Sequence, residues 1–142
     1  DATAESCAIA AKVISAAKIH AGIETKLLIG FFLMVPRKVW DEVGEFDPAF
    51  VLGCDDLDYS IRVKQMGYKL VIAPDVFVFH EGHVSFREEG SPALEMNRKS
   101  EEHMRAKLAE LYKDRIPTSV ELWGCEIFAT AKTADIERAV LA

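Results

Sequence analysis

The stretch GCDDLDYSIRVKQMGY, residues 53–68, decides the fold expected for this chain of 142 residues. It places the carboxylates of Asp55, Asp56 and Asp58 at the start of a segment, residues 56–66, whose pattern predicts a helix. One acidic side chain suits such a start, because it caps the helix or opposes the helix dipole. Three exceed that need, so capping alone and a role as base, metal ligand or partner of a cation both stay open. Like charges this close also predict that one of them holds its proton unusually tightly.

The predicted helix carries apolar side chains on two faces. Asp58 and Arg62 stand four residues apart, which is the spacing of an ion pair along a helix. Gly67 ends the pattern, as a glycine commonly ends a helix. The residues of the two faces are Leu57, Ile61 and Lys64 on one side and Tyr59, Val63 and Met66 on the other.

Strand and helix patterns alternate along the rest of the chain, which indicates an α/β fold. The predicted helices are residues 4–20, 36–43, 91–113 and 133–141, and the predicted strands are residues 27–35, 68–73, 76–80 and 121–131. Thr3 or Asp1 is expected to cap the first helix, and Asp47-Pro48 is expected to open a turn. The sheet is too small for a complete doubly wound domain. We therefore expect a partial domain with a small mixed sheet flanked by helices.

Composition narrows the class of protein. The formal net charge of −6 argues against broad binding to nucleic-acid phosphates, and half of the residues are hydrophobic, as in a globular domain. The three cysteines are widely separated and odd in number, so a disulfide framework is not expected and a reducing, cytoplasmic compartment fits best. No apolar run reaches the roughly 18 residues of a membrane span. The chain starts without a methionine or a secretory leader, so we expect it to be a piece of a longer protein.

A set of residues follows the order typical of one enzyme family. In chain order they are Gly30, Arg37, Trp40, Gly44, Phe46, Asp47, Asp55, Asp56, Asp58, Arg62, Gly67, Tyr68, Pro74, Asp75, His80 and Ser85. By this order and spacing, the chain resembles the C-terminal, acceptor-side half of family 2 glycosyltransferases, which have the GT-A fold. The resemblance covers about 60 of the 142 residues. One departure is conservative, since the family usually has Glu-Asp where this chain has Asp55-Asp56.

The resemblance implies roles for the acidic residues. Asp56 would be the general base, which takes the proton from the acceptor hydroxyl as its oxygen attacks the anomeric carbon. Asp55 would hold the acceptor or orient the base. Gly30 and the pair of Asp58 and Arg62 would support the site, the pair as a structural salt bridge.

The resemblance also implies a metal and a donor. His80 would be a ligand of a divalent cation, Mg²⁺ or Mn²⁺, which neutralises the leaving diphosphate. The reaction would be inverting and metal-dependent, moving a sugar from a nucleotide-diphosphate sugar to a hydroxyl of a glycan or lipid-linked acceptor. The nucleotide-binding half of the family, which also supplies metal-binding aspartates, has no counterpart here. The isolated chain is therefore expected to be inactive and to bind nucleotide sugars weakly or not at all.

The expected organisation has three parts. Residues 1–25 hold an N-terminal helix, residues 26–116 form the acceptor and catalytic half of a GT-A-like domain, and residues 117–142 are a C-terminal extension. Attachment to the cytoplasmic face of a membrane and formation of a homodimer stay open.

Other interpretations stay open as well. The DLD triplet of residues 56–58 is formally a D-x-D metal motif, but it lies downstream of the Gly-led strand, where the family has its base. A zinc site at His80 and His83 needs two further ligands. A glycoside hydrolase fits poorly, because its two carboxylates must face each other roughly 5 to 9.5 Å apart. A non-catalytic interaction or dimerisation module would use the apolar stripe of the long helix, which is Leu94, Met104, Leu108 and Leu111.

Overall fold

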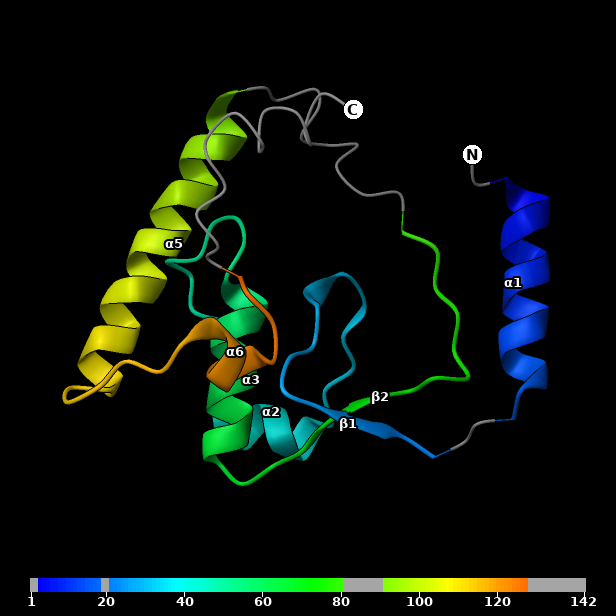
Figure 1. The fold of residues 1–142 in the computed structure, drawn as a ribbon, viewed down its shortest axis with the longest axis horizontal. Coiled ribbons are helices and arrows are strands. Elements are labelled where there is room, and N and C mark those ends of the chain that lie inside the picture. The colour runs from blue at the N-terminus through cyan, green and yellow to red at the C-terminus, as the bar shows by residue number, and fades with distance from the viewer. Residues whose placement is uncertain (1–2, 19–20, 81–90, 128–142) are drawn as a thin grey trace.

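The computed structural model describes residues 3–18, 21–80 and 91–127 and has a mixed α/β fold (Figure 1). The elements are α1 (Ala4–Ala16), β1 (Ile23–Thr25), the 3₁₀ helix η1 (Gly30–Phe32), α2 (Arg37–Val43), α3 (Asp55–Gln65), β2 (Leu70–Ile72), α5 (Ser91–Leu111) and α6 (Ser119–Trp123). The expected α/β class is therefore confirmed at this level.

Helix α3 is the centre of the fold because it gives a different face to each of two hydrophobic clusters. On one face Leu57 and Ile61 pack with residues of α5 and α6. On the other, Tyr59 and Val63 pack with Leu70 and with residues of α2. For these four residues the two-faced pattern predicted from the sequence is confirmed. Met66, predicted to continue the second face, is exposed.

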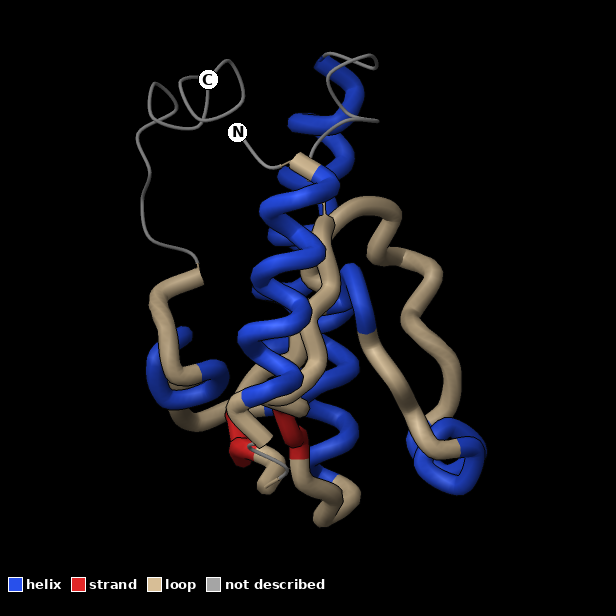
Figure 2. Tube along the Cα trace, turned by 90° about the vertical axis from the view of Figure 1, so that its right-hand side faces the viewer, coloured by secondary structure: helices blue, strands red, loops and turns tan. Residues whose placement is uncertain are grey.

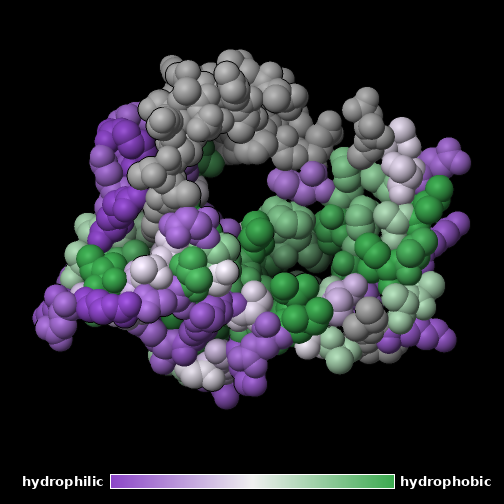
Figure 3. Space-filling view, viewed as in Figure 1, coloured by the Kyte–Doolittle hydropathy of each residue, from purple (hydrophilic) through white to green (hydrophobic). Residues whose placement is uncertain are grey.

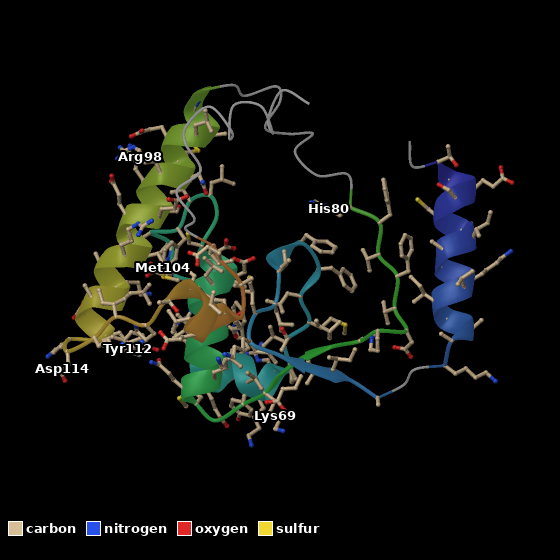
Figure 4. The ribbon with its side chains drawn as sticks, viewed as in Figure 1. Lys69, His80, Arg98, Met104, Tyr112 and Asp114 are labelled. Atoms are coloured by element: carbon tan, nitrogen blue, oxygen red, sulfur yellow. The ribbon has the colours of Figure 1, made fainter. Side chains whose placement is uncertain are left out.

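The first cluster joins α3 to α5 and α6. Met104 is almost fully buried on the side of α5 that faces α3, and Leu108 lies one turn further along (Figure 4). From α6, Trp123 adds its ring to the cluster and its Nε1 donates a hydrogen bond to the Leu57 carbonyl at 3.3 Å. The predicted stripe on the long helix is thus half right, because Leu94 and Leu111 are exposed.

Helix caps largely follow the sequence. Thr3 caps α1 in a capping box with Ser6, since each side chain accepts a hydrogen bond from the other's backbone N–H. Gly44 ends α2 with φ of 89°, and Gly67 follows α3 with φ of 81°, both in the region that favours glycine. Helix α1 ends at Ala16, short of the predicted residue 20.

The sheet consists of β1 and β2 alone within the described residues, at one end of the molecule (Figure 2). The strands are antiparallel, with Ile23 opposite Ile72 and Thr25 opposite Leu70. The predicted mixed sheet is therefore wrong for the part of the chain that is described. The predicted strand at residues 68–73 is confirmed in its centre, as β2.

Residues 27–35 do not form the predicted strand. They hold η1 between two extended stretches, and their side chains divide between the two clusters, with Leu27 in the first and Leu28, Leu33 and Val35 in the second. An apolar run of this kind becomes a buried strand only where strands flank it on both sides. Neither β1 nor β2 pairs with residues 27–35, so this segment packs along α3 instead.

Two further predicted strands are also wrong. Residues 76–80 are irregular. Of the strand predicted at 121–131, residues 121–123 belong to helix α6, and residues 128–131 lie outside the described residues. A helix begins here because Thr118 and Glu121 form a capping box. The apolar residues around Trp123 made the segment resemble a strand in the sequence. The predicted helix at residues 133–141 lies outside the described residues.

A broad apolar surface is exposed on one side of the molecule. Helix α1 stands apart from the helices around α3 and buries no residue fully (Figure 1). Hydrophobic side chains gather across the middle and right of the face in Figure 3. The exposed hydrophobic residues of α1, of residues 29–34 and of residues 71–79 are together called the open apolar face: Ile9, Val13, Ile29, Phe31, Phe32, Met34, Val71, Ile72, Val76 and Phe79. Of the described helices, none combines the length and the hydrophobicity needed to cross a bilayer.

Candidate functional site

The candidate site lies at the N-terminus of α3, directly after two residues in the left-handed conformation. Gly53 has φ of 74° and Cys54, the N-cap residue, has φ of 67°. No side chain caps the helix, so capping by an Asp, one of the interpretations left open above, does not occur, and all three carboxylates lie in the first turn. Cys54 is buried beneath them, and burial, assisted by nearby acidic side chains, raises the pKa of its thiol to about 12. The thiol is therefore a packing group rather than a nucleophile.

Asp56 is held in place by two backbone N–H groups. The Gly30 N–H donates to its Oδ2 at 3.0 Å and the Leu57 N–H donates to its Oδ1 at 2.8 Å. Burial raises the pKa of the Asp56 carboxyl, the Asp55 charge adds to this, and the hydrogen bond from Gly30 opposes it. The expectation that one of the three carboxyls holds its proton more tightly is thus supported, with burial as the main cause rather than charge repulsion.

Gly30 brings the η1 loop against both acidic residues. A Cβ atom built at Gly30 would lie 3.5 Å from the Asp56 Cβ, 3.8 Å from its Oδ2 and 3.9 Å from the Asp55 Oδ2. Both carboxylates therefore approach the same point of the loop, which is exposed. The supporting role that the resemblance assigns to Gly30 has a clear basis, since its backbone amide orients Asp56.

His80 lies beside the same loop. Its ring stacks on that of Phe31, with centroids 4.9 Å apart and planes inclined by 17°. Phe31 directly follows Gly30, so Asp56, Gly30, Phe31 and His80 form one continuous series of contacts. Figure 4 shows His80 at the end of the segment that leads away from β2, on the side of the η1 loop. The imidazole is exposed, so it is not a buried structural histidine.

No group of three or more His, Cys, Asp or Glu side chains that could hold a metal occurs within residues 3–18, 21–80 and 91–127. His80 alone is present as the ligand that the resemblance implies. His83, the second ligand of the alternative zinc site, and Ser85 lie outside the described residues.

Asp58 forms an ion-pair clamp rather than part of the reactive site. Its Oδ2 accepts from the Arg62 Nε at 2.8 Å, as the spacing predicted, and its Oδ1 lies 2.7 Å from the Lys107 Nζ on α5. Arg62 also donates to the carbonyls of Val43 and Glu45, at the end of α2. Since Asp58 is almost fully buried, these partners offset the cost of burying its charge.

The clamp extends to the turn at Asp47. The Lys107 Nζ lies 2.8 Å from the Asp47 Oδ2, and the His103 Nε2 lies 3.2 Å from the same oxygen. Asp47 also accepts from the Ala49 N–H, and the Lys107 ammonium with these hydrogen bonds holds the pKa of Asp47 far below its ordinary value. The aromatic ring of Phe50 packs edge-on against His103. We call Asp47, Asp58, Arg62 and Lys107 the interhelical clamp.

The sequence did not point to Lys107, His103 or Phe31. Lys107 and His103 lie in a charged stretch of α5, a pattern typical of a solvated face, and only the packing of α5 on α3 brings them to acidic partners. Phe31 looked like one more residue of a buried strand. Its position directly after Gly30 was the one available signal.

No family model, no curated protein and no solved structure matches the chain. The arguments about the site therefore rest on its geometry and chemistry.

Proposed function

We propose that this chain is the C-terminal, acceptor-side part of an inverting, metal-dependent glycosyltransferase of family 2 type with a GT-A fold. The enzyme moves a sugar from a nucleotide-diphosphate sugar to a hydroxyl of a glycan or of a lipid-linked acceptor. The observation that carries the proposal is the approach of Asp55 and Asp56 to the exposed Gly30 loop, next to the stacked rings of Phe31 and His80.

Asp56 has the properties of the base. Two N–H groups fix its carboxylate, and one side of the site is open toward the exposed loop. The pKa of Asp56 is raised from its ordinary value, so its carboxylate is a stronger base. A base whose pKa lies closer to neutral pH is better suited to general-base catalysis there. Asp55 is half-buried beside Asp56 and approaches the same loop, which supports a role in orienting the acceptor hydroxyl.

His80 fits the role of one metal ligand. Stacking on Phe31 uses the face of the imidazole and leaves both ring nitrogens at its edge, where a neutral histidine binds Mg²⁺ or Mn²⁺. The cation, when bound, neutralises the charge that develops on the leaving diphosphate. The further ligands belong to the nucleotide-binding half, without which the chain is inactive.

The open apolar face supports the proposal of a missing half. A folded monomer rarely exposes a contiguous apolar patch of more than a few hundred square ångströms unless a partner covers it. A two-stranded sheet is also only marginally stable on its own. The face includes Val71 and Ile72 of β2, and also Phe31, which contacts His80.

The metal dependence of the complete enzyme tests the proposal. Replacing His80 by Ala is expected to lower the Mn²⁺ affinity, measured by calorimetry with donor present, by about tenfold or more, because a direct ligand is lost. His103→Ala is the matched control, since His103 pairs with Asp47 of the clamp and not with the residues of the site. Equal Mn²⁺ affinity in wild type and His80→Ala removes His80 from the metal site.

A second candidate is a non-catalytic interaction module, in which the open apolar face binds a second copy of the chain. The exposed Met34 and Val13, at 82% and 65% of their surface, favour it. The α5 stripe named for this role cannot serve throughout, because Met104 and Leu108 are buried in the chain's own core. Light scattering of the 142-residue chain decides: a dimer is expected for the module, and a monomer at high concentration contradicts it.

A further inference from the structure

Two side chains of α3 that are four residues apart bind the backbone of the same loop. The Asp56 Oδ2 accepts a hydrogen bond from the Gly30 N–H at 3.0 Å. The Ser60 Oγ accepts one from the Leu28 N–H at 3.2 Å. Residues four apart lie on one face of a helix, so a single face of α3 holds both contacts. The η1 loop is therefore attached to α3 at two points, of which only one is the candidate base.

The spacing of the two attachment points matches between helix and loop. Ile29, between the two donors, has φ of −91° and ψ of 129°, which is extended backbone. In an extended chain the N–H groups of residues i and i+2 point to the same side and lie about 6.6 Å apart. Four residues of an α-helix rise about 6 Å. The two donors thus run along α3 in register with the two acceptors, and in the opposite chain direction.

Ser60 is the buried member of the two attachment points. It is 3% exposed, whereas Asp56 is half-buried and Gly30 is exposed. A hydrogen bond in a buried, low-dielectric environment is stronger and opens less often than one at the surface. Between the two points Ile29 is 62% exposed, so its side chain adds little packing that could hold the loop. The exposed contact at Gly30 therefore depends on the buried contact at Ser60.

Packing alone does not fix the position of the loop along α3. Leu28 packs, partly buried, against the second cluster, but apolar contacts are non-directional. The hydrogen bond from its N–H to the Ser60 Oγ is directional, so it determines which loop residue faces which turn of the helix. A slip of one residue would move the Gly30 N–H by about 3.3 Å, beyond hydrogen-bond reach of the Asp56 carboxylate.

We propose that Ser60 is a positioning residue of the candidate site: by holding the Leu28 N–H, it keeps the Gly30 N–H on the Asp56 carboxylate. Ser60 acts through the loop and not on the substrate. Its consequence for catalysis rests on the proposed role of Asp56 as the general base. Such a base must be held within about 0.5 Å of its productive position, and the Gly30 N–H fixes one of its two oxygens.

The test follows the Gly30 amide proton by NMR while the 142-residue chain is titrated with acid. In the wild type this signal is expected to move as Asp56 ionises, because the N–H donates to that carboxylate. We expect Ser60→Ala and Ser60→Cys each to reduce the amplitude of this movement by about half or more. Alanine lacks the acceptor, whereas cysteine nearly keeps the volume but accepts weakly, so the two variants separate the hydrogen bond from lost packing.

The amplitude is measured in the folded state, so a lower stability of either variant does not change it. Ser119→Ala is the matched control, because it removes the hydroxyl of another buried serine, on α6. It is expected to leave the movement of the Gly30 signal at the wild-type amplitude. The proposal is overturned if the Gly30 signal does not follow Asp56 in the wild type, if either Ser60 variant keeps the full amplitude, or if Ser119→Ala lowers it as much.

Turnover of the complete enzyme gives a second readout. Ser60→Ala is expected to lower kcat by about tenfold while donor affinity stays the same, because a misplaced base slows the chemical step. If Asp56→Asn loses turnover and Ser60→Ala keeps it, Ser60 does not position the base and the proposal is overturned. If Asp56→Asn keeps turnover, the proposed function fails instead, and the Gly30 signal alone decides the role of Ser60.

Discussion

Asp56→Asn is expected to lower the turnover number of the complete enzyme by about 10³-fold, while donor binding stays nearly intact. General-base catalysis contributes about 10²- to 10⁴-fold, and an amide cannot accept the proton of the acceptor hydroxyl. The replacement is nearly isosteric: the Asn oxygen still accepts the hydrogen bond that the Gly30 N–H gives to Asp56, and the hydrogen bond from the Leu57 N–H is lost because the Asn NH2 group cannot accept it. Steady-state kinetics with saturating donor and a calorimetric donor titration measure the two quantities.

The stability of the same variant separates a catalytic loss from misfolding. Because burial raises the pKa of Asp56, the folded state binds the proton more tightly than the unfolded chain. The free energy of unfolding therefore falls as the pH rises from the ordinary value of 3.8 through the folded-state pKa. At neutral pH the charge of Asp56 costs stability, whereas the NH2 group of Asn cannot accept the second backbone hydrogen bond, so Asp56→Asn is expected to stay within about 1 kcal/mol of the wild-type free energy of unfolding.

Asp55→Asn is the control for the position of the charge, since Asp55 adjoins the base but is not assigned its proton transfer. A smaller loss is expected there. If Asp56→Asn keeps its turnover, or if Asp55→Asn loses as much as Asp56→Asn, then Asp56 is not the base.

Lys107→Met is expected to lower the free energy of unfolding by about 2 kcal/mol, because it leaves two carboxylates short of a partner. Lys107 contacts the Asp58 Oδ1 at 2.7 Å and the Asp47 Oδ2 at 2.8 Å. Arg62 remains on Asp58 and His103 on Asp47, so the loss stays below that of a fully orphaned buried pair. Urea unfolding followed by circular dichroism measures the change.

Lys99→Met is the matched control for this prediction. Lys99 lies on the same helix, is largely exposed and pairs only loosely with Glu95 at 3.7 Å, so its replacement should change stability by less than about 0.5 kcal/mol. A similar effect at both lysines would mean that helix propensity or net charge, and not the clamp, is responsible.

Helices were predictable here because their signals are local. The start and stop of α2 and α3 follow from Gly44, Gly67 and the spacing of apolar residues, and the pair of Asp58 and Arg62 follows from a separation of four. Such signals need no knowledge of distant residues. The candidate site profits from this, because Asp55 and Asp56 lie in the first turn of the best-predicted helix.

Strands and interhelical contacts were not predictable in the same way. Whether residues 27–35 form a strand depends on neighbours that the local sequence does not contain, and Gly30 instead gives its amide to Asp56. Likewise, the contact between Lys107 and Asp47 could not be predicted, because the two residues are 60 positions apart in the sequence. The stacking of His80 on Phe31 is equally long-range.

The two-sided packing of α3 limits how this protein can change in evolution. A substitution at Ile61 that shifts the helix also moves Val63 and Tyr59 within the opposite cluster, since a rigid helix transmits the displacement. Mutations on either flank are therefore expected to be coupled in their effects on the free energy of unfolding. The position of the acidic first turn, which belongs to the same rigid helix, therefore depends on the packing of both clusters.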